Sequence, residues 1–470
     1  MRKRILGAAL AAAIVMLGAL GASLVGPAGS ADSAPQSSGE GVDARGTPPQ
    51  VGKMLREIDH ENVQESIETL VGFGTRNTLS SQTDPVRGIG AARDWIFSEF
   101  QRYAADSDGR MTVELQSYLQ EPASRIPVPT VITNVVATLR GTQPESANRM
   151  YVVSGHYDSM CGSSTDGTCD APGAGDDASG VAAVLEMARV MSKREWDATI
   201  VFMAVAGEEQ GLYGSRHYAS QAKLNGLQIE GMFTNDIVGS SVGGTGIRDP
   251  FSVRLFAEGV PTDETDSEAN RRRSIGGEND SPARQMARFV EEVAENSHTN
   301  MDVKVIYRRD RFGRGGDHIS FLEQGYRSAV RFTEVNEDFD HQHQDVRVEN
   351  GELIGDLPQY VDFKYIARVA RVNAAALAAL ADAPVAPKDV RIAGGLSYDT
   401  SLRWDANPEP DLAGYEIVWR NTTDADWRRS IWVGNVTSFV VQNMSKDNFF
   451  FGVRAVDTEG NRSPVTFPRP

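Results

Sequence analysis

The sequence has little cysteine and fewer positive than negative charges, and both features limit the classes of protein to which it can belong. Its 470 residues include 47 Lys and Arg against 64 Asp and Glu, so the net charge is −17. That charge repels phosphate, and no basic stripe overrides it, so we exclude nucleic acid as a partner. The hydrophobic content of 40% and the charged content of 24% are those of a soluble globular protein.

Cys161 and Cys169 are the only two cysteines, and both lie in one loop rich in Gly and Ser, "MCGSSTDGTCDAPG". Thiolates eight residues apart with no second pair are a weak indication of a zinc site. An even count in an exported protein favours a disulfide. We therefore predict a local disulfide between Cys161 and Cys169.

Export is predicted from the first residues, which read "MRKRILGAALAAAIVMLGALGASLVGPAGSADSA". A cationic start, an apolar run and small residues after it are the parts of a secretory signal peptide, placed at residues 1–31. The apolar run is near membrane-spanning length, so an uncleaved anchor is the alternative. Residues 32–50, rich in Ser, Gly, Pro and Ala, are predicted to be a flexible linker or propeptide. We expect a secreted protein that is extracellular or associated with the cell surface.

Two domains follow by pattern. In residues 51–383, short apolar runs such as "MYVVSG" and "TIVFMAVAG" alternate with segments of helical spacing such as "SGVAAVLEMARVMSKR". This predicts an α/β fold, a mostly parallel sheet flanked by helices on both faces. Residues 384–470 carry short alternating or aromatic strands, which predict a small all-β sandwich.

The predicted sandwich resembles a fibronectin type III module. Trp404 stands in an early strand, Tyr415 begins a central one, and "FFFGVRAVDTEGNRSP" looks like the late hairpin. The tail also contains four Asn-x-Ser/Thr triplets, at Asn421, Asn435, Asn443 and Asn461. Their use for glycosylation depends on the host, and chance accounts for them equally well.

Polar residues follow the apolar strands of the first domain at each point where a strand is expected to end. They are His156 and Asp158, Asp176 and Asp177, Glu208 and Glu209, Asp236, and later His341 and His343. Singly, each has an ordinary explanation: a hydrogen-bonded histidine, an N-cap before a helix, or a solvated turn. Together, at the carboxyl ends of parallel strands, imidazoles and carboxylates predict a zinc site.

The ordered set "GHYDS", "GAGDDASG", "GEEQGLYGS", "NDIVGS" and "HQHQD" also resembles a known family, the co-catalytic zinc exopeptidases typified by bacterial leucyl aminopeptidases. The resemblance runs from His156 to Asp345. It implies the zinc exopeptidase fold, two zinc ions as cofactors, and peptides with a free N-terminus as substrates. Glutaminyl cyclases are relatives, but they lack the first histidine, which is present here.

Carried over by position, the resemblance implies a role for each residue. It assigns His156 and Asp236 to one metal, Glu209 and His341 to the other, and Asp176 to both, with a cis peptide bond between Asp176 and Asp177. Asp158 would orient the His156 imidazole, and Glu208 would be the general base.

His341 is preferred to His343 because of an acid four residues later. The family's last ligand is commonly followed at that offset by an acid, and His341 has Asp345 there, whereas His343 has Arg347. We keep His343 as a neighbour of the site.

One departure concerns the residue before the last ligand. It is often a tyrosine that assists the oxyanion, but here it is Asp340. Tyr307, Arg311 and Arg314, in "YRRDRFGRGGDHISF", are candidates to replace it in substrate binding, with a solvated loop as the alternative.

The sequence thus predicts a secreted dizinc aminopeptidase. A carboxypeptidase or dipeptidase of the same fold is the first alternative, because Arg311 and Arg314 offer a cationic pocket for a substrate carboxylate. A non-catalytic peptide-binding relative is the second alternative. The tail is expected to contact polysaccharide, the cell surface or another protein.

Overall fold

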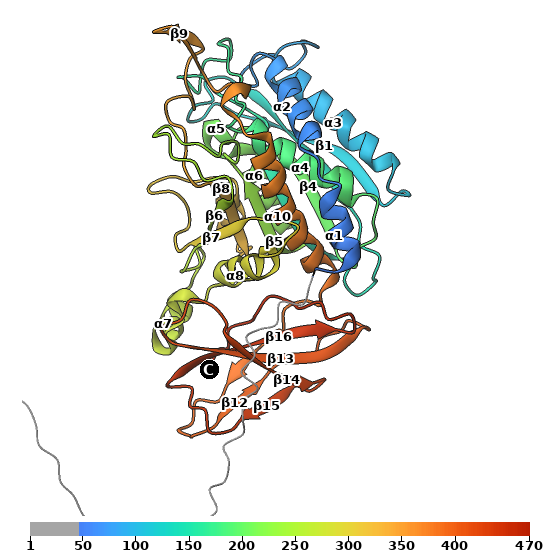
Figure 1. Ribbon diagram of the computed structural model, residues 1–470, viewed down its shortest axis with the longest axis vertical. Coiled ribbons are helices and arrows are strands. Elements are labelled where there is room, and N and C mark those ends of the chain that lie inside the picture. Colours follow the sequence, from blue (N-terminus) through green and yellow to red (C-terminus); the bar gives the residue numbers. More distant parts are fainter. Residues whose placement is uncertain (1–46) are drawn as a thin grey trace, which may run out of the picture. The chain divides into compact units, whose positions relative to one another are not determined.

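Eight strands form the main sheet, in the order β1-β2-β4-β3-β5-β8-β6-β7 (Figure 1). The computed structural model describes residues 47–470. The strands are β1 (Met111–Gln120), β2 (Thr130–Leu139), β3 (Arg149–His156), β4 (Thr199–Val205), β5 (Gln228–Asn235), β6 (Ser252–Phe256), β7 (Asp302–Ile306) and β8 (Ala329–Glu334). The predicted signal peptide and most of the predicted linker lie outside the described residues.

The middle of this sheet is parallel and its margins are mixed. β3 pairs in parallel with β4 and β5, and β5 pairs in parallel with β8. β1–β2, β2–β4 and β6–β8 are antiparallel, while β6 and β7 are parallel. The predicted α/β class with a mostly parallel central sheet is confirmed. The parallel centre matters for function because it brings the carboxyl ends of β3, β4 and β5 to one edge.

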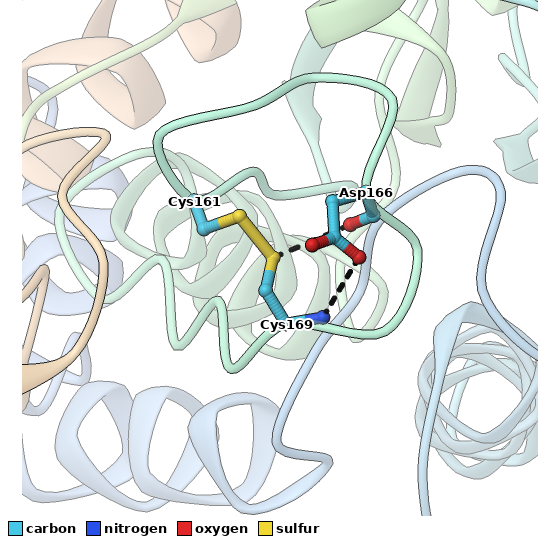
Figure 2. A group of neighbouring side chains, drawn as sticks. All are labelled: Cys161, Asp166 and Cys169. Carbon is cyan, nitrogen blue, oxygen red and sulfur yellow. Dashed lines mark hydrogen bonds between the residues drawn. A yellow bond between two sulfur atoms is a disulfide. The ribbon is translucent and has the colours of Figure 1, made fainter.

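A disulfide closes part of the long loop between β3 and helix α4 (Ala178–Met191). Cys161 and Cys169 are joined directly, with an S–S distance of 2.14 Å (Figure 2). The Asp166 carboxylate accepts a hydrogen bond from the Cys169 backbone N–H at 3.2 Å. Asp166 and the two cysteine sulfurs lie close enough to hold a metal ion. The sulfurs are bonded to each other, however, so they offer no thiolate ligand.

Both faces of the sheet are buried, which explains the continuous apolar runs of its central strands. In β4, Ile200, Phe202 and Ala204 join the larger core on one face. The residues between them, Val201 and Met203, join a second core on the other. Side chains alternate across a strand, so a strand with two buried faces needs apolar residues at every position.

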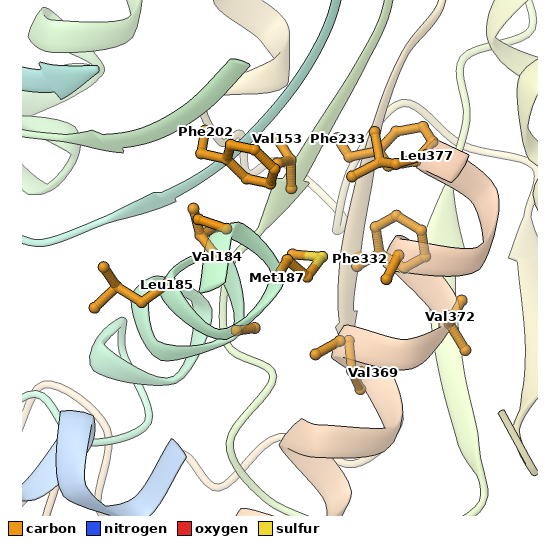
Figure 3. Close-up of a cluster of buried hydrophobic side chains, with 14 of the residues drawn as sticks. Val153, Val184, Leu185, Met187, Phe202, Phe233, Phe332, Val369, Val372 and Leu377 are labelled. Atoms are coloured by element: carbon orange, nitrogen blue, oxygen red, sulfur yellow. The ribbon is translucent and has the colours of Figure 1, made fainter. Parts of the chain in front are cut away.

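Helices cover these two faces unequally. The larger core includes residues of α1 (Pro49–Arg56), α2 (His60–Gly72), α3 (Ile89–Ala105), α4 (Ala178–Met191), α8 (Pro282–Ala294) and α10 (Phe363–Asp382). Figure 3 shows Met187 of α4 pointing toward Phe332 and α10, while Val184 of α4 lies below Phe202 of β4 in this view. The opposite face is covered by α6 (Tyr213–Leu224) and α9 (His318–Glu323).

Smaller elements complete this part of the chain. They are α5 (Glu208–Gly211), α7 (Asp266–Ile275), η1 (Gly277–Asn279), β9 (Arg347–Glu349), β10 (Glu352–Ile354) and η2 (Pro358–Tyr360). Between residues 47 and 470, no helix is both long enough and apolar enough to cross a membrane. α1 already begins at Pro49, so the last two residues of the predicted linker form helix.

The tail forms two three-stranded antiparallel sheets. One has the order β11-β12-β15 and the other β14-β13-β16. Their strands are β11 (Arg391–Ile392), β12 (Thr400–Arg403), β13 (Leu412–Asn421), β14 (Arg429–Gly434), β15 (Ser438–Val441) and β16 (Phe449–Asp457). Trp404 and Tyr415 lie in the core they share, with ring centroids 5.3 Å apart. An all-β tail was expected, and its likeness to fibronectin type III stays a prediction.

Buried polar contacts join the tail to the α/β part. Arg420 of β13 makes two hydrogen bonds to the Asp280 carboxylate, at 2.7 and 2.9 Å, and both side chains are almost fully buried. The Trp427 indole donates to the Gln285 side chain at 3.0 Å. Buried charges that are paired in this way indicate a fixed interface.

Candidate dimetal site

The predicted ligands meet at the carboxyl edge of the parallel strands. His156 is the last residue of β3, Asp236 directly follows β5, and Glu209 lies in the first turn of α5, four residues after β4 ends. Asp176 comes from the loop before α4. All four side chains are buried. The sheet topology, more than any single residue, therefore creates the site.

A first group consists of His156, Asp176 and Asp236, whose ligand atoms lie within 4.8 Å of one another. Nε2 of His156 is 3.0 Å from Oδ1 of Asp176 and 3.9 Å from Oδ1 of Asp236. Oδ2 of Asp236 is buried and has no hydrogen-bond partner among the described residues. A buried carboxylate oxygen left in this state is costly unless a cation completes it.

A second group consists of Asp176, Glu209 and His343. Nε2 of His343 is 2.7 Å from Oδ2 of Asp176 and 3.0 Å from Oε1 of Glu209. Asp176 therefore turns one oxygen toward each imidazole. This is the arrangement expected of a carboxylate that bridges two metal ions, the role that the resemblance implies for it.

The structure places His343, not His341, in the second group, so His343 joins the predicted His341 as a candidate ligand. Nδ1 of His341 is 2.7 Å from the Asp338 carboxylate, and its ring stacks on Tyr360 with centroids 3.6 Å apart. Nε2 of His341 is buried and has no hydrogen-bond partner among the described residues, so its role as a ligand stays a prediction. Asp345 accepts a hydrogen bond from the Gly162 N–H at 3.0 Å, which ties this loop to the disulfide loop.

Local backbone shape decides which of the two histidines turns toward Asp176 and Glu209. The two residues lie in an irregular loop after β8, and His343 has a left-handed φ of 55°. A non-glycine residue in that conformation reverses the local direction of the chain. No pattern in "HQHQD" reveals which imidazole such a turn presents.

Asp158 supports the site in two ways, and only one of them was predicted. Its backbone carbonyl lies 3.1 Å from Nδ1 of His156, and its carboxylate 3.5 Å from the same atom. A carbonyl oxygen only accepts, so Nδ1 carries the proton and Nε2 stays free for a metal. In addition, the Asp158 carboxylate accepts the backbone N–H groups of Glu208 and Glu209, at 3.3 and 3.1 Å. It thereby fixes the turn that presents both glutamates.

Glu208 lies beside both groups without belonging to either. The turn begins at Gly207, whose φ of 76° favours glycine. Burial raises the pKa of Glu208 well above its usual range, and the Asp236 and Glu209 carboxylates add to the rise, although His156 opposes it. A carboxyl group with a raised pKa is suited to accept and return a proton.

Asp177 and Asp356 support the site through backbone N–H groups, and of the two only Asp177 was singled out in the sequence. Asp177 is the N-cap of α4, accepting the Gly180 N–H at 2.9 Å, and it also accepts the His156 N–H at 3.0 Å. The peptide bond before it is cis, as the resemblance implies. Asp356 accepts the N–H groups of Gly175 and Asp176, at 2.7 and 2.8 Å. The N-cap signal was visible in the sequence, whereas Asp356, far along the chain, gave none.

Arg331 is a further residue that the sequence did not reveal. It lies in β8, is fully buried, and its guanidinium is 2.8 Å from Oδ1 of Asp236. It also contacts the Asp310 carboxylate at 3.2 Å. An arginine inside an apolar strand, "AVRFTE", was the signal, because such a residue needs a buried partner.

The residues predicted to bind substrate do not enter either group. The Tyr307 ring lies under the Arg284 guanidinium, 4.5 Å away. Arg311 pairs with Glu337 at 2.6 Å. Arg314 has no ion pair among residues 47–470. Their role stays a prediction.

The donor set fits two zinc ions. Each group supplies one imidazole nitrogen with carboxylate oxygens, a combination that zinc accepts. Although burial opposes it, the Glu209 and Asp176 carboxylates raise the pKa of His343 to about 11. A metal ion at this position would replace the proton on His343. The buried carboxylates around it favour either a proton or a metal ion there.

Comparison with known proteins agrees with this chemistry. Residues 134–352 match the profile of peptidase family M28. A probable zinc metalloprotease of Leptosphaeria maculans is 53% identical over 422 residues, 90% of this chain and 97% of the relative. Another, of Pyricularia oryzae, is 51% identical over 438 residues, 92% of this chain and 87% of the relative.

Among solved structures, the Legionella pneumophila LapA aminopeptidase aligns at a TM-score of 0.49 and 18% identity, over 71% of this chain and 75% of its own. The fold and the imidazole–carboxylate groups define a zinc metalloprotease of mixed α/β architecture. With relatives of this identity over nearly the whole chain, the protein belongs to peptidase family M28.

Proposed function

We propose that the protein is a dizinc aminopeptidase that removes N-terminal residues from peptides. The observation that supports this most is Asp176, whose two carboxylate oxygens face His156 and His343 at 3.0 and 2.7 Å. One zinc ion would be held by His156 and Asp236, the other by Glu209 and His343, with Asp176 shared. Bound zinc ions supply a water of lowered pKa and polarise the scissile carbonyl.

The protein's own residues would then move the proton and hold the geometry. Glu208 takes the proton of the attacking water and returns it to the leaving amine. Asp158 keeps Glu208 and Glu209 in place through their backbone N–H groups. The excess of carboxylates attracts the α-ammonium group of a peptide, which favours substrates with a free N-terminus.

A substrate panel tests this proposal. The zinc-loaded protein should cleave leucine p-nitroanilide and leave its N-acetyl analogue intact, and a chelator should abolish the activity. Release of C-terminal residues from N-blocked peptides would instead favour the carboxypeptidase alternative. Cleavage of neither class would favour a non-catalytic binding protein.

We propose further that the protein is exported. The signal-like residues 1–31 and the Cys161–Cys169 disulfide, a bond typical of oxidising compartments, support export. N-terminal sequencing of protein from the culture medium would test it: a start after about residue 31 is expected, and retention of the full chain in the membrane fraction would favour the anchor.

A further inference from the structure

A cavity of about 390 Å³ lies beside the site and is rich in arginine. Four of its lining residues are Arg254, Arg308, Arg311 and Arg314, and Glu337 is the one acidic residue that lines it. In a chain with a net charge of −17, four guanidinium groups around one cavity are a marked local reversal of sign. Like charges gathered in this way favour an anion between them.

Two of the four arginines already form ion pairs within the protein. Arg254 and Arg311 each lie 2.6 Å from a different oxygen of Glu337. Arg308 and Arg314 are exposed and have no ion pair among the described residues. Their guanidinium groups therefore stay available for a ligand carboxylate, to which each can form a bidentate pair of hydrogen bonds.

Aromatic side chains give this cavity further means to hold a peptide. Phe312 and Phe339 line it and are 87% and 67% exposed, unusual for phenylalanine. The Arg308 guanidinium lies 5.3 Å from the centre of the Phe312 ring, which helps to hold it in place. If this segment were only a solvated loop, it would have no need of exposed aromatic rings beside arginines that lack an ion pair.

Both walls of the cavity lead directly to the candidate metal ligands. The loop that carries Arg308 to Arg314 continues to Gly316, where an added Cβ would lie 3.1 Å from Oδ2 of Asp236. The other wall, with Glu337 and Phe339, continues to His343 in the second group. Two segments that line the cavity therefore continue, within a few residues, to the candidate metal ligands.

We propose that this cavity is a substrate subsite for a carboxylate, bound by Arg308 and Arg314. The inference rests on the proposed peptidase function and adds a substrate class to it: peptides with an acidic side chain near the scissile bond, or short peptides whose terminal carboxylate reaches the cavity. The two sources share one chemistry and differ in where the carboxylate stands.

Four peptides with a common N-terminal residue separate these sources. Leu-Asp-Ala amide is compared with its neutral isostere Leu-Asn-Ala amide, and Leu-Ala-Ala acid with Leu-Ala-Ala amide. We expect the zinc-loaded protein to show about tenfold lower KM for at least one carboxylate peptide than for its neutral partner, with similar kcat. Higher salt should reduce the ratio.

The double variant Arg308→Gln/Arg314→Gln should bring that ratio close to one, chiefly by raising KM for the carboxylate peptides. Arg308→Lys/Arg314→Lys should restore part of it. The control Arg403→Gln/Arg429→Gln removes two exposed arginines of the tail, which have no ion pair among the described residues, and should keep the wild-type ratio. Equal loss in the control would point to long-range charge and overturn the subsite.

Turnover and binding are measured separately so that the two proposals can fail separately. Calorimetric binding of the same peptides to the zinc-loaded Glu208→Gln variant repeats the comparison without catalysis. Cleavage or binding of all four peptides without a carboxylate preference would overturn the subsite alone. A binding preference without any cleavage would keep the subsite and overturn the proposed peptidase activity.

Discussion

Glu208 and Glu209 are adjacent in the chain but have different surroundings. Oε1 of Glu209 lies 3.0 Å from Nε2 of His343, whereas Glu208 belongs to neither ligand group. The Asp158 carboxylate holds both backbone N–H groups, so the turn fixes where each side chain points. This division predicts different results for the same substitution at the two positions.

Glu208→Gln should lower kcat by about 10²- to 10⁴-fold, the usual range for loss of a positioned general base, and leave two zinc ions bound. Glu209→Gln is the matched control and should lose metal as well as activity. Steady-state kinetics and metal analysis by mass spectrometry measure both. A Glu208→Gln protein with full kcat would show that the base is another group.

The two late histidines give a second residue-scale test. His343→Ala should reduce bound zinc from two ions to about one, because its Nε2 lies in the second group. His341→Ala removes the imidazole two residues earlier in the chain, which pairs with Asp338, and should keep both ions. Zinc content after dialysis distinguishes the two histidines. Loss of one ion in His341→Ala but not in His343→Ala would instead assign His341 to the metal site, as the acid at Asp345 predicts.

At the scale of elements, the disulfide loop supports both walls of the metal site. Gly162 donates to the Asp345 carboxylate at 3.0 Å, two residues beyond His343. On the other side, the Gln210 amide donates to the Ser164 carbonyl at 2.9 Å, next to Glu209. One covalently closed loop thus restrains two of the three chain segments that carry the second ligand group, those of Glu209 and His343.

Cys161→Ser/Cys169→Ser should therefore weaken zinc binding at the second group as well as stability. Loss of a short disulfide loop is expected to cost about 2 kcal/mol of the free energy of unfolding. Thermal melting and zinc titration measure the two effects. A variant with a lower Tm but unchanged zinc affinity would show that the loop stabilises the fold without supporting the ligands.

Helices and strands whose formation depends on the pattern of neighbouring residues could be predicted from the sequence. The runs "MYVVSG" and "TIVFMAVAG" became β3 and β4, the helical spacing between them became α4, and α10 covers the long alanine-rich segment. His156, Asp176, Glu209 and Asp236 then met at one edge because parallel strands end together. Antiparallel β1, β2 and β6 were not foreseen, since strand order depends on contacts between distant segments.

Contacts between distant segments also account for what was missed in the site. Asp356 holds the Asp176 N–H from 180 residues away. Arg331 reaches Asp236 across two paired strands, β5 and β8. His343 depends on the shape of a loop. Local pattern identifies the residue types that zinc needs, but the folded chain decides which copy of each type reaches the site.

For the whole molecule, the tail is bound to the α/β part through charged groups of both signs. Arg454 of β16 contacts Glu292 of α8 at 3.0 Å, and Arg149 of β3 contacts Glu409 at 3.4 Å. A cavity of about 510 Å³ next to Arg454 is lined by Asp382 of α10 and by Glu459 of the tail. A tail bound in this way forms one structural unit with the α/β part, whatever else it contacts.

The acidic side of this interface predicts a pH dependence of stability. Burial raises the pKa of Asp382 to about 7, and the carboxylates of Asp197, Glu459 and Asp457 add to the rise. The folded protein therefore binds a proton at Asp382 that the unfolded chain, with a pKa of 3.8, releases earlier. A raised carboxyl pKa means that stability falls as the pH rises from about 4 to 7.

Asp382→Asn removes this contribution and should flatten the fall in stability between about pH 4 and pH 7, gaining at most about 4 kcal/mol at neutral pH. Urea unfolding of both proteins at steps of pH measures the difference. Asp94→Asn is the control, since its carboxylate is 65% exposed on the surface, and it should leave the pH dependence unchanged. Parallel curves for Asp382→Asn and the wild type would mean that Asp382 is ionised equally in the folded and unfolded chains, and that the acidic groups of the tail do not strain the interface.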